Sequence, residues 1–155
     1  MHWRAVRRVP IGEVRDRIAA LESKYGDQFR GLHEEFIQGR MPRERFDDYV
    51  EWSGMNHALR AAAEGEDFDY YAEEELDLTM EEFETLTPRR LELIDYLADE
   101  HASSINELAA KVGRDVKNVY NDLMQLERLG FLRLTREGRN TVPELLVQEI
   151  TLSLG

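Results

Sequence analysis

The chain has 155 residues and a formal net charge of −12; 42% of its residues are hydrophobic and 34% are charged. No apolar run approaches the ~18 residues needed to cross a membrane, no signal-peptide core follows the basic first residues, and the absence of cysteine excludes disulfides and thiolate metal sites. These features predict a cytoplasmic protein with one domain, or with a small domain and a helical extension.

Residues 1–63 are predicted to form a helical segment that serves partner binding or dimerisation. Its first residues, Met1–Ile11, are basic and fit a short strand or an arm. Apolar residues at spacings of three and four then predict a helix over Glu13–Tyr25. A second apolar stripe ends before Gly39, and Pro42 suits the first turn of a third helix.

Six aromatic residues fall within 28 positions of this segment, from Tyr25 to Trp52. Aromatic side chains anchor protein interfaces, but they also fill ordinary cores. Because so small a helical unit has a marginal core, we expect the stripe as a whole to bind a partner while individual rings fill the core. The predicted partner-binding residues are Phe29, Phe36, Phe46, Tyr49 and Trp52.

Residues 64–85 are predicted to form an acidic linker. The stretch Glu64–Glu84 carries 11 acidic residues and no basic one. Acidic runs are most often solvated, although acids interleaved with hydrophobic residues also let a segment grip a basic groove. We therefore predict a linker over Glu64–Asp69, and a strand or helix over Leu76–Phe83 that packs on the domain that follows.

Residues 86–155 begin with the signals of two capped helices. Thr87 caps the first helix and Pro88 occupies its first position. Ser104 and Glu107 fit a capping box at the start of the second helix. The residues predicted to point inward from the first helix are Leu91, Leu93, Ile94 and Leu97.

A third helix and a hairpin follow Gly113, which ends the second helix. Phe131–Thr135 reads as a strand and Glu137–Gly138 as a hairpin turn. Pro143 is expected to interrupt the second hairpin strand and to mark it as an edge, and the apolar residues of Val147–Leu154 predict a final strand or a dimerisation segment. The apolar stripe of the third helix is Val116, Val119, Leu123, Leu126 and Leu129, with Gly130 as its stop.

Helix, glycine turn, helix and basic hairpin is the pattern of a winged helix-turn-helix. The predicted fold class is therefore mainly α with a small β-wing (α+β). In such a unit the third helix enters the major groove of DNA, where Arg and Lys donate to guanine and Asn pairs with adenine. The predicted DNA-binding residues are Arg114, Lys117, Asn118 and Asn121 on that helix, with Arg136, Arg139 and Asn140 on the hairpin.

The charge distribution favours a local nucleic-acid surface on an acidic protein. Residues 1–86 carry 11 basic and 21 acidic residues, whereas residues 111–139 carry 7 basic and 4 acidic ones. A locally basic patch of this kind provides the phosphate attraction that DNA binding requires. Exposed Arg and Asn are also ordinary on any helix, so a protein-docking role for the same unit stays open.

The segment from Leu86 to about Ile150 resembles the MarR-like winged-helix regulators of prokaryotes. The resemblance rests on L-T-P-R-R-L-E-L-I-D-Y-L and on the later G-R-D-V-K-N-V, which in that family opens the recognition helix. It implies a transcriptional regulator. We expect a homodimer bound to a palindromic double-stranded operator, with recognition helices ~34 Å apart.

The segment from Val14 to Leu59 resembles a small prokaryotic antitoxin module. The shared features are R-I-A-A-L-E-S-K-Y-G, a spaced F-x-x-x-F and D-D-Y-V-E-W. This resemblance implies an autorepressing antitoxin that neutralises a small basic toxin. The alternatives are a stand-alone MarR-like regulator, a regulator whose N-terminal half senses a small molecule, and an interaction module that does not bind DNA.

No catalytic pattern stands out in the sequence. The four histidines lack the spacing that would seat zinc, and no glycine-rich phosphate loop or nucleophile elbow is present. Asp47, Asp48 and Glu51 form a carboxylate cluster, but nothing flanks it to tune a pKa. We predict a non-enzyme without catalytic residues, cofactor, metal or membrane partner.

Overall fold

The computed structural model describes residues 1–26, 29–65, 70–76 and 78–155, with residues 70–76 described by their backbone alone. These residues divide into two compact units. Unit 1 comprises Met1–Arg8 and Ala72–Gly155, and unit 2 comprises Val9–Tyr71. No helix within the described ranges is long and apolar enough to cross a lipid bilayer.

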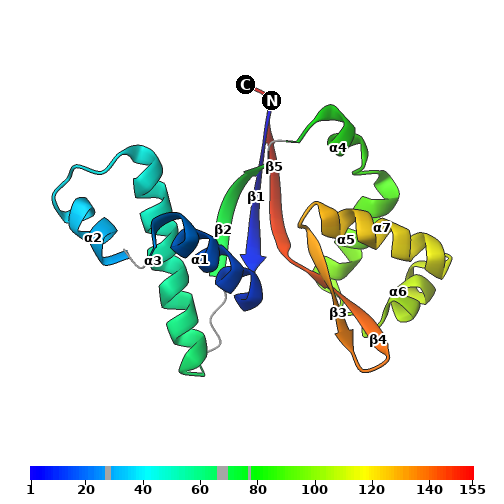
Figure 1. The fold of residues 1–155 in the computed structure, drawn as a ribbon. Coiled ribbons are helices and arrows are strands. Elements are labelled where there is room, and N and C mark those ends of the chain that lie inside the picture. The colour runs from blue at the N-terminus through cyan, green and yellow to red at the C-terminus, as the bar shows by residue number, and fades with distance from the viewer. Residues whose placement is uncertain (27–28, 66–69, 77) are drawn as a thin grey trace. The chain divides into compact units, whose positions relative to one another are not determined.

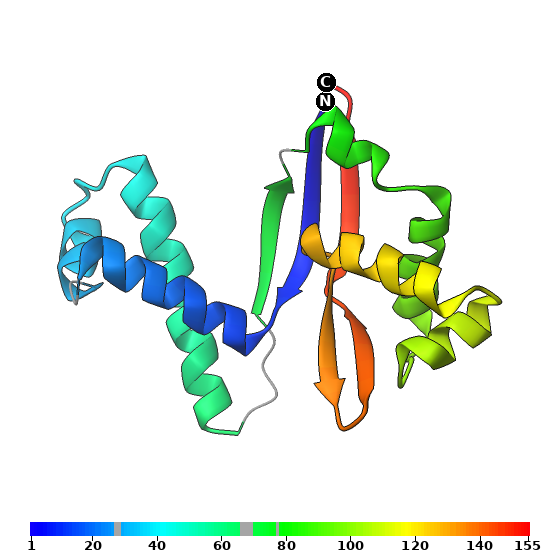
Figure 2. The same cartoon turned by 45° about the vertical axis from the view of Figure 1, so that its right-hand side comes forward.

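The described part of unit 2 contains the helices α1 (Ile11–Tyr25), α2 (Phe29–Ile37) and α3 (Arg43–Ala63). The long helix α3 packs against both α1 and α2 (Figure 2). Its buried residues, spaced by three or four, are Tyr49, Trp52, Met55, Ala58 and Ala61. The three predicted helices are therefore confirmed.

The ends of these helices follow the residues that the sequence provides. Gly26, with a positive φ of 66°, caps the C-terminal end of α1, as glycine commonly does. Pro42 lies immediately before α3 rather than in its first turn. In α1 the buried positions are Val14, Ile18 and Leu21, which is the face that the spacing predicted.

Unit 1 contains a three-stranded sheet of order β2-β1-β5 (Figure 1). Its strands are β1 (His2–Val9), β2 (Tyr70–Leu76) and β5 (Val147–Ser153). β1 and β5 are antiparallel, with a register that runs from His2↔Ser153 to Arg7↔Val147. The first residues of the chain thus form the central strand of this sheet, and the predicted final strand is confirmed.

The remaining elements of unit 1 have the order of a winged helix-turn-helix. The short helix α4 (Met80–Glu84) precedes α5 (Pro88–Asp99), α6 (Ile105–Val112) and α7 (Val116–Arg128). A two-stranded antiparallel hairpin of β3 (Leu132–Glu137) and β4 (Asn140–Leu145) follows. The described elements therefore confirm a mainly α fold with a small β-wing.

The core of unit 1 joins these helices to the sheet. Leu93, Leu108 and Leu123, one from each of α5, α6 and α7, are 0% exposed. Ala5 of β1 and Phe131, which precedes β3, belong to the same buried cluster. The core thus fixes α7, and with it the outward face of α7, against the rest of the unit.

The domain boundaries differ from the predicted ones. Residues 1–63 were predicted to form one segment, but Met1–Arg8 belong to unit 1 because β1 pairs with β5. The predicted acidic linker, residues 64–85, contains β2 and α4, so a strand and a helix both occur near Leu76–Phe83. Of the predicted Glu64–Asp69 linker, residues 66–69 lie outside the described residues.

Three local predictions also need correction. Leu91 is 44% exposed, because the first turn of α5 extends past the core that buries Leu93. Pro143 is buried within a continuous β4. A proline is tolerated there because β4 pairs with β3 alone among the described strands, and the missing N–H can face away from β3. The Ser104 hydroxyl accepts from the Glu107 N–H at 3.0 Å as predicted, but the Glu107 carboxylate accepts from the Ser103 hydroxyl.

Candidate nucleic-acid interface

The first turns of α7 present polar side chains to solvent. Gly113, at φ 68°, ends α6, and the Asp115 carboxylate then accepts a hydrogen bond from the Lys117 N–H at 2.8 Å, which starts α7. On the inner face Val119, Leu123 and Leu126 are 0% exposed. The predicted readers Lys117, Asn118 and Asn121 are all exposed on the other faces of the helix.

The β3–β4 hairpin brings a second set of predicted residues to the surface. Its ladder ends at the pair Glu137↔Asn140, and Gly138 takes a φ of 62° in the turn. The turn therefore lies at Gly138 and Arg139, one residue later than predicted, because Glu137 is the last residue of β3. Arg136, Arg139 and Asn140 are exposed at this end of the hairpin.

A groove of about 530 Å³ lies between the first turn of α7 and the hairpin tip. Lys117 lines it from α7, and Arg139 and Asn140 line it from the hairpin. The structure thus brings three of the predicted residues to one surface. The rest of its lining is Ser104, Ile105, Asn106, Asp115, Val116, Tyr120 and Thr141; Asn118, Asn121 and Arg136 are exposed but lie outside the lining.

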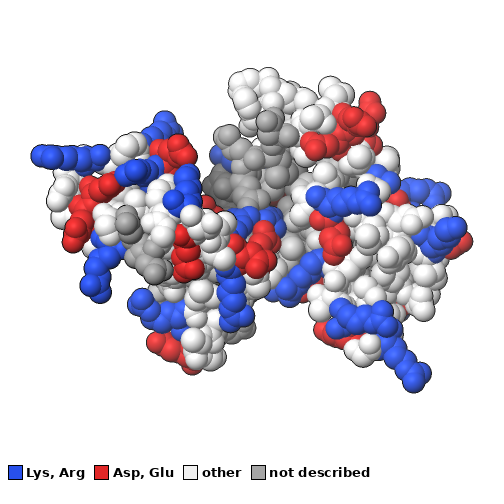
Figure 3. Space-filling model, in the orientation of Figure 1, with Lys and Arg blue, Asp and Glu red and all other residues white. Residues whose placement is uncertain are grey.

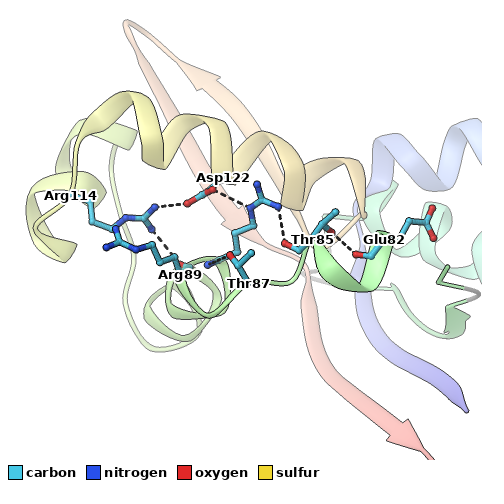
Figure 4. A network of polar contacts seen from close by, with 7 residues as sticks. Glu82, Thr85, Thr87, Arg89, Arg114 and Asp122 are labelled. Carbon is cyan, nitrogen blue, oxygen red and sulfur yellow. Dashed lines mark hydrogen bonds and ion pairs between the residues drawn. The ribbon is translucent and has the colours of Figure 1, made fainter. Parts of the chain in front are cut away.

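Arg114 does not belong to this surface, which corrects the prediction. Its side chain is only 8% exposed and forms an ion pair with Asp122 (Figure 4). It also donates to the carbonyl oxygen of Arg89 at 3.3 Å. Arg114 precedes α7, and its side chain turns inward because the Asp122 carboxylate of α7 accepts from it there. In this arrangement Arg114 cannot contact a base.

Asp122 accepts from a second arginine as well. The Arg90 Nε lies 3.0 Å from one Asp122 oxygen, and Arg90 also donates to the Thr85 carbonyl oxygen at 2.8 Å. The network therefore fastens the start of α5 to the middle of α7 (Figure 4). Sequence reasoning missed it, because residues 32 positions apart in the chain show no local pattern.

Basic side chains remain exposed around the hairpin after the internally paired arginines are set aside. Of the basic residues in 111–139, Arg114 is paired internally and Arg133 donates to Glu144 at 2.5 Å. Burial, and then the nearby charge of Arg8, lower the pKa of Arg133. Figure 3 shows basic side chains projecting at the hairpin end of unit 1. Within residues 111–139, the exposed basic residues are Lys111, Lys117, Arg128, Arg136 and Arg139.

The groove also contains two apolar side chains that sequence reasoning did not assign to it. Val116 is 43% exposed and Tyr120 is 45% exposed. Val116 was predicted to lie in the buried stripe, but the first turn of α7 projects beyond the core. The spacing of four between the two residues was the available signal, because residues one turn apart share a side of a helix.

The aromatic residues of unit 2 form a second candidate surface. Tyr49 and Trp52 are 8% and 3% exposed, so these two predicted partner-binding residues are core residues. Phe29 packs between them, with ring centroids 5.6 Å from Tyr49 and 5.1 Å from Trp52. Phe36 and Phe46 are 42% and 41% exposed and stack on each other at 5.9 Å. Of the five predicted partner-binding residues, all of which the structure describes, only Phe36 and Phe46 are exposed.

The carboxylate cluster near Asp48 has an internal explanation. Asp48 accepts from the Tyr25 hydroxyl at 2.5 Å and from Lys24 at 3.0 Å, and Glu51 accepts from Arg17 at 3.2 Å. Burial raises the pKa of Asp48, but the hydrogen bonds from Tyr25 and Lys24 outweigh burial and leave that pKa lowered. Within the described ranges, no three His, Asp or Glu residues are placed to hold a metal ion.

Comparison with known proteins gives one result for the winged unit. The family described as HVO_A0114 matches residues 85–152, which run from the start of the α5 region into β5. No curated protein matches the chain. The matched residues include the whole groove between α7 and the hairpin and none of unit 2.

Proposed function

We propose that the chain is a sequence-specific DNA-binding transcriptional regulator that uses α7 and the β3–β4 hairpin as its reading surface. The observation that carries the proposal is the shared groove, in which Lys117 of α7 faces Arg139 and Asn140 of the hairpin. A helix of this kind enters the major groove with its N-terminal turns. A basic hairpin beside it then reaches the adjacent phosphates or the minor groove.

The charge pattern supports the same proposal. Residues 111–139 have a net charge of +3 within a chain of net charge −12. A strongly acidic protein binds DNA only where a local surface offsets the repulsion. We propose that two copies bind a palindromic operator, as the two-fold symmetry of such sites requires.

Substitutions at the groove test this proposal. Lys117→Ala and Arg139→Ala should each weaken binding to the DNA upstream of the chain's own gene about tenfold and lower the salt slope by about one. Footprinting and gel shifts at several salt concentrations measure both effects. Arg15→Ala, an exposed charge on unit 2, removes the same charge away from the groove and should bind like the parent.

Equal weakening by Arg15→Ala would show that only total charge matters. If no upstream sequence were protected, the regulator proposal would be wrong and a protein-docking role for the winged unit would replace it.

A second function is proposed for unit 2, namely binding of a protein partner such as a small basic toxin. The supporting observation is the pair of exposed, stacked rings of Phe36 and Phe46. Ile37, 68% exposed, is next to Phe36 in the chain, and Val50, 51% exposed, lies one turn after Phe46 on α3. Exposed apolar side chains that cluster in this way mark protein interaction sites. Together with the first proposal, this would make the chain an autorepressing antitoxin.

Co-expression with the neighbouring gene's product tests the second function. Changing both Phe36 and Phe46 to Ser should abolish protection against a toxic neighbour, whereas Gln38→Ser, an exposed polar change nearby, should preserve it. If protection survived the loss of both rings, the antitoxin proposal would fail and the regulator would stand alone.

A further inference from the structure

The groove between α7 and the hairpin has an apolar side that the fold does not use. Val116 and Tyr120 are 43% and 45% exposed, whereas Val119 and Leu123 of the same helix are fully buried. Because Val116 and Tyr120 lie one turn apart, they form a continuous strip along one side of α7. Lys117 lines the same groove beside this strip.

The chemistry of base edges identifies what such a strip fits. In the major groove, the one apolar group that a base pair displays is the C5-methyl group of thymine. Guanine and cytosine have no methyl group at that edge. An apolar strip beside a lysine in a DNA-reading helix therefore gains a methyl contact only over A·T pairs.

An exposed asparagine of the helix favours the same base pair. Asn121 is exposed one turn after Lys117, and an asparagine amide forms a bidentate pair with adenine, the base opposite thymine. Arg114, the arginine that precedes the first turn of α7 and would favour guanine, is paired with Asp122 inside unit 1. The start of α7 therefore presents Asn121 and an apolar strip that suit A·T pairs, and Lys117 is the guanine donor that is exposed there.

We infer that Val116 and Tyr120 are specificity-determining residues that select A·T-rich DNA by contact with thymine methyl groups in the major groove. This inference rests on the proposed DNA binding and adds the class of sequence that is bound. Each methyl group contacted contributes about fourfold in affinity, which is the transfer free energy of one such group expressed as a ratio.

Four synthetic duplexes of ~20 base pairs, with alternating dA·dT, dA·dU, dI·dC or dG·dC, test the inference with the full chain. Uracil is thymine without the methyl group. The dI·dC duplex has the major-groove edge of G·C with a minor groove that resembles A·T. Fluorescence anisotropy should show the tightest binding to dA·dT, with a loss of about four- to sixteen-fold on dA·dU if one or two methyl groups are contacted.

Two variants separate the methyl contact from general binding. Val116→Ala should lower the dA·dT to dA·dU ratio about fourfold, because only the contact of Tyr120 is left; it is a mild change, because Val116 is exposed and alanine favours helix. Lys117→Ala is the matched control, and it should weaken binding to all four duplexes while the ratio is preserved.

The other outcomes of the binding measurements would overturn either the inference or the proposed function. Equal affinity for dA·dT and dA·dU in the parent chain would overturn the inference while DNA binding stands. Equal affinity for dI·dC and dA·dT, both above dG·dC, would also overturn it, because A·T pairs would then be read from the minor groove. Failure to bind any duplex or any upstream sequence would overturn the proposed function itself.

Discussion

Arg90 and Arg114 approach the two oxygens of a single carboxylate, that of Asp122. The side chains are 20%, 8% and 16% exposed respectively, and the Arg114 Nε is buried without a hydrogen-bond partner within the described residues. Two cations therefore share one anion where solvent screens them little. Removing the anion costs more than removing one of the cations, because a buried charge without a partner is the expensive state.

This asymmetry gives the first prediction. Asp122→Ala should destabilise unit 1 by about 2 to 3 kcal/mol, because Arg114 is left charged and buried. Arg114→Met fills a similar space without a charge and should cost less, about 1 kcal/mol. Urea denaturation followed by circular dichroism measures both, and Asp95→Ala on the exposed side of α5 is the control. Equal losses for Asp122→Ala and Arg114→Met would mean that the ion pairs do not carry the effect.

Residues such as these mark what the sequence could and could not predict. The stripe Val119, Leu123 and Leu126 followed from spacing and is buried, but the same spacing placed Val116 inside, because periodicity identifies a face without showing where the core ends. Arg114 was predicted to be exposed because it is not part of the apolar stripe of the helix. Its direction depends on Asp122, and a pair eight residues apart leaves no periodic signal.

At the scale of elements, α1 and α3 are held together by charge as well as by apolar burial. Lys24 of α1 donates to Glu44 and Asp48 of α3 at 2.9 and 3.0 Å, and Tyr25 of α1 donates to the same Asp48. The hydrogen bond to Glu44, and then that to Asp48, raise the pKa of Lys24, and the bond to Asp48 raises the pKa of Tyr25. The stability of the α1–α3 pair therefore depends on pH through the Asp48 carboxylate.

The second prediction concerns that sensitivity. Because the pKa of Asp48 is lowered in the folded chain, its contribution is complete above the ordinary carboxyl pKa and is lost as the pH falls through the folded value. Unit 2 should lose stability on acidification, and Asp48→Asn should flatten that loss. Urea titrations from about pH 5 to about pH 2, followed by Trp52 fluorescence in a Trp3→Phe background, measure the profile.

Asp47→Asn is the matched control, because it removes a carboxylate from an exposed position on the same helix. It should keep the acid profile of the parent. An Asp48→Asn profile as steep as the parent's would contradict the role assigned to this carboxylate.

The sequence predicted where helices and strands occur better than which of them pair or pack together. The helices α1 to α3 and α5 to α7 follow from caps, glycines and spacing, whereas α4 was predicted only as a strand or a helix. No local feature of β1 indicates that it pairs with β5. Strand pairing over such a separation depends on side chains that meet only after folding, such as Ala5, which packs among residues of α5, α6 and α7. This is why residues 1–8 were assigned to the wrong unit.

At the scale of the whole molecule, unit 2 is inserted into unit 1 between β1 and the last residues of β2. The third prediction follows from this topology. Ala5→Asp places a charge at a position 1% exposed and should destabilise unit 1 by about 3 kcal/mol or more, although Ala5 lies far in sequence from the residues of α5, α6 and α7 among which it packs. Unit 2 should keep its stability.

The two tryptophans allow both units to be followed, since Trp3 belongs to unit 1 and Trp52 to unit 2. Single-tryptophan variants in urea should show an early transition for Trp3 alone. His2→Asp, an exposed change in the same strand, is the control and should leave both transitions in place. If Ala5→Asp left the Trp3 transition at the same urea concentration, β1 would contribute little to the stability of unit 1.

The pairing of β1 with β5 also affects how the chain is made. Residues 2–7 leave the ribosome long before their partners at 147–153, a delay of roughly ten to thirty seconds at ordinary rates of synthesis. During that time one edge of β1 has no strand beside it, and an open edge invites pairing with other nascent chains. Arg4, Arg7 and Arg8 place three positive charges on this strand, and mutual repulsion between such edges protects each growing chain until its own last strand arrives.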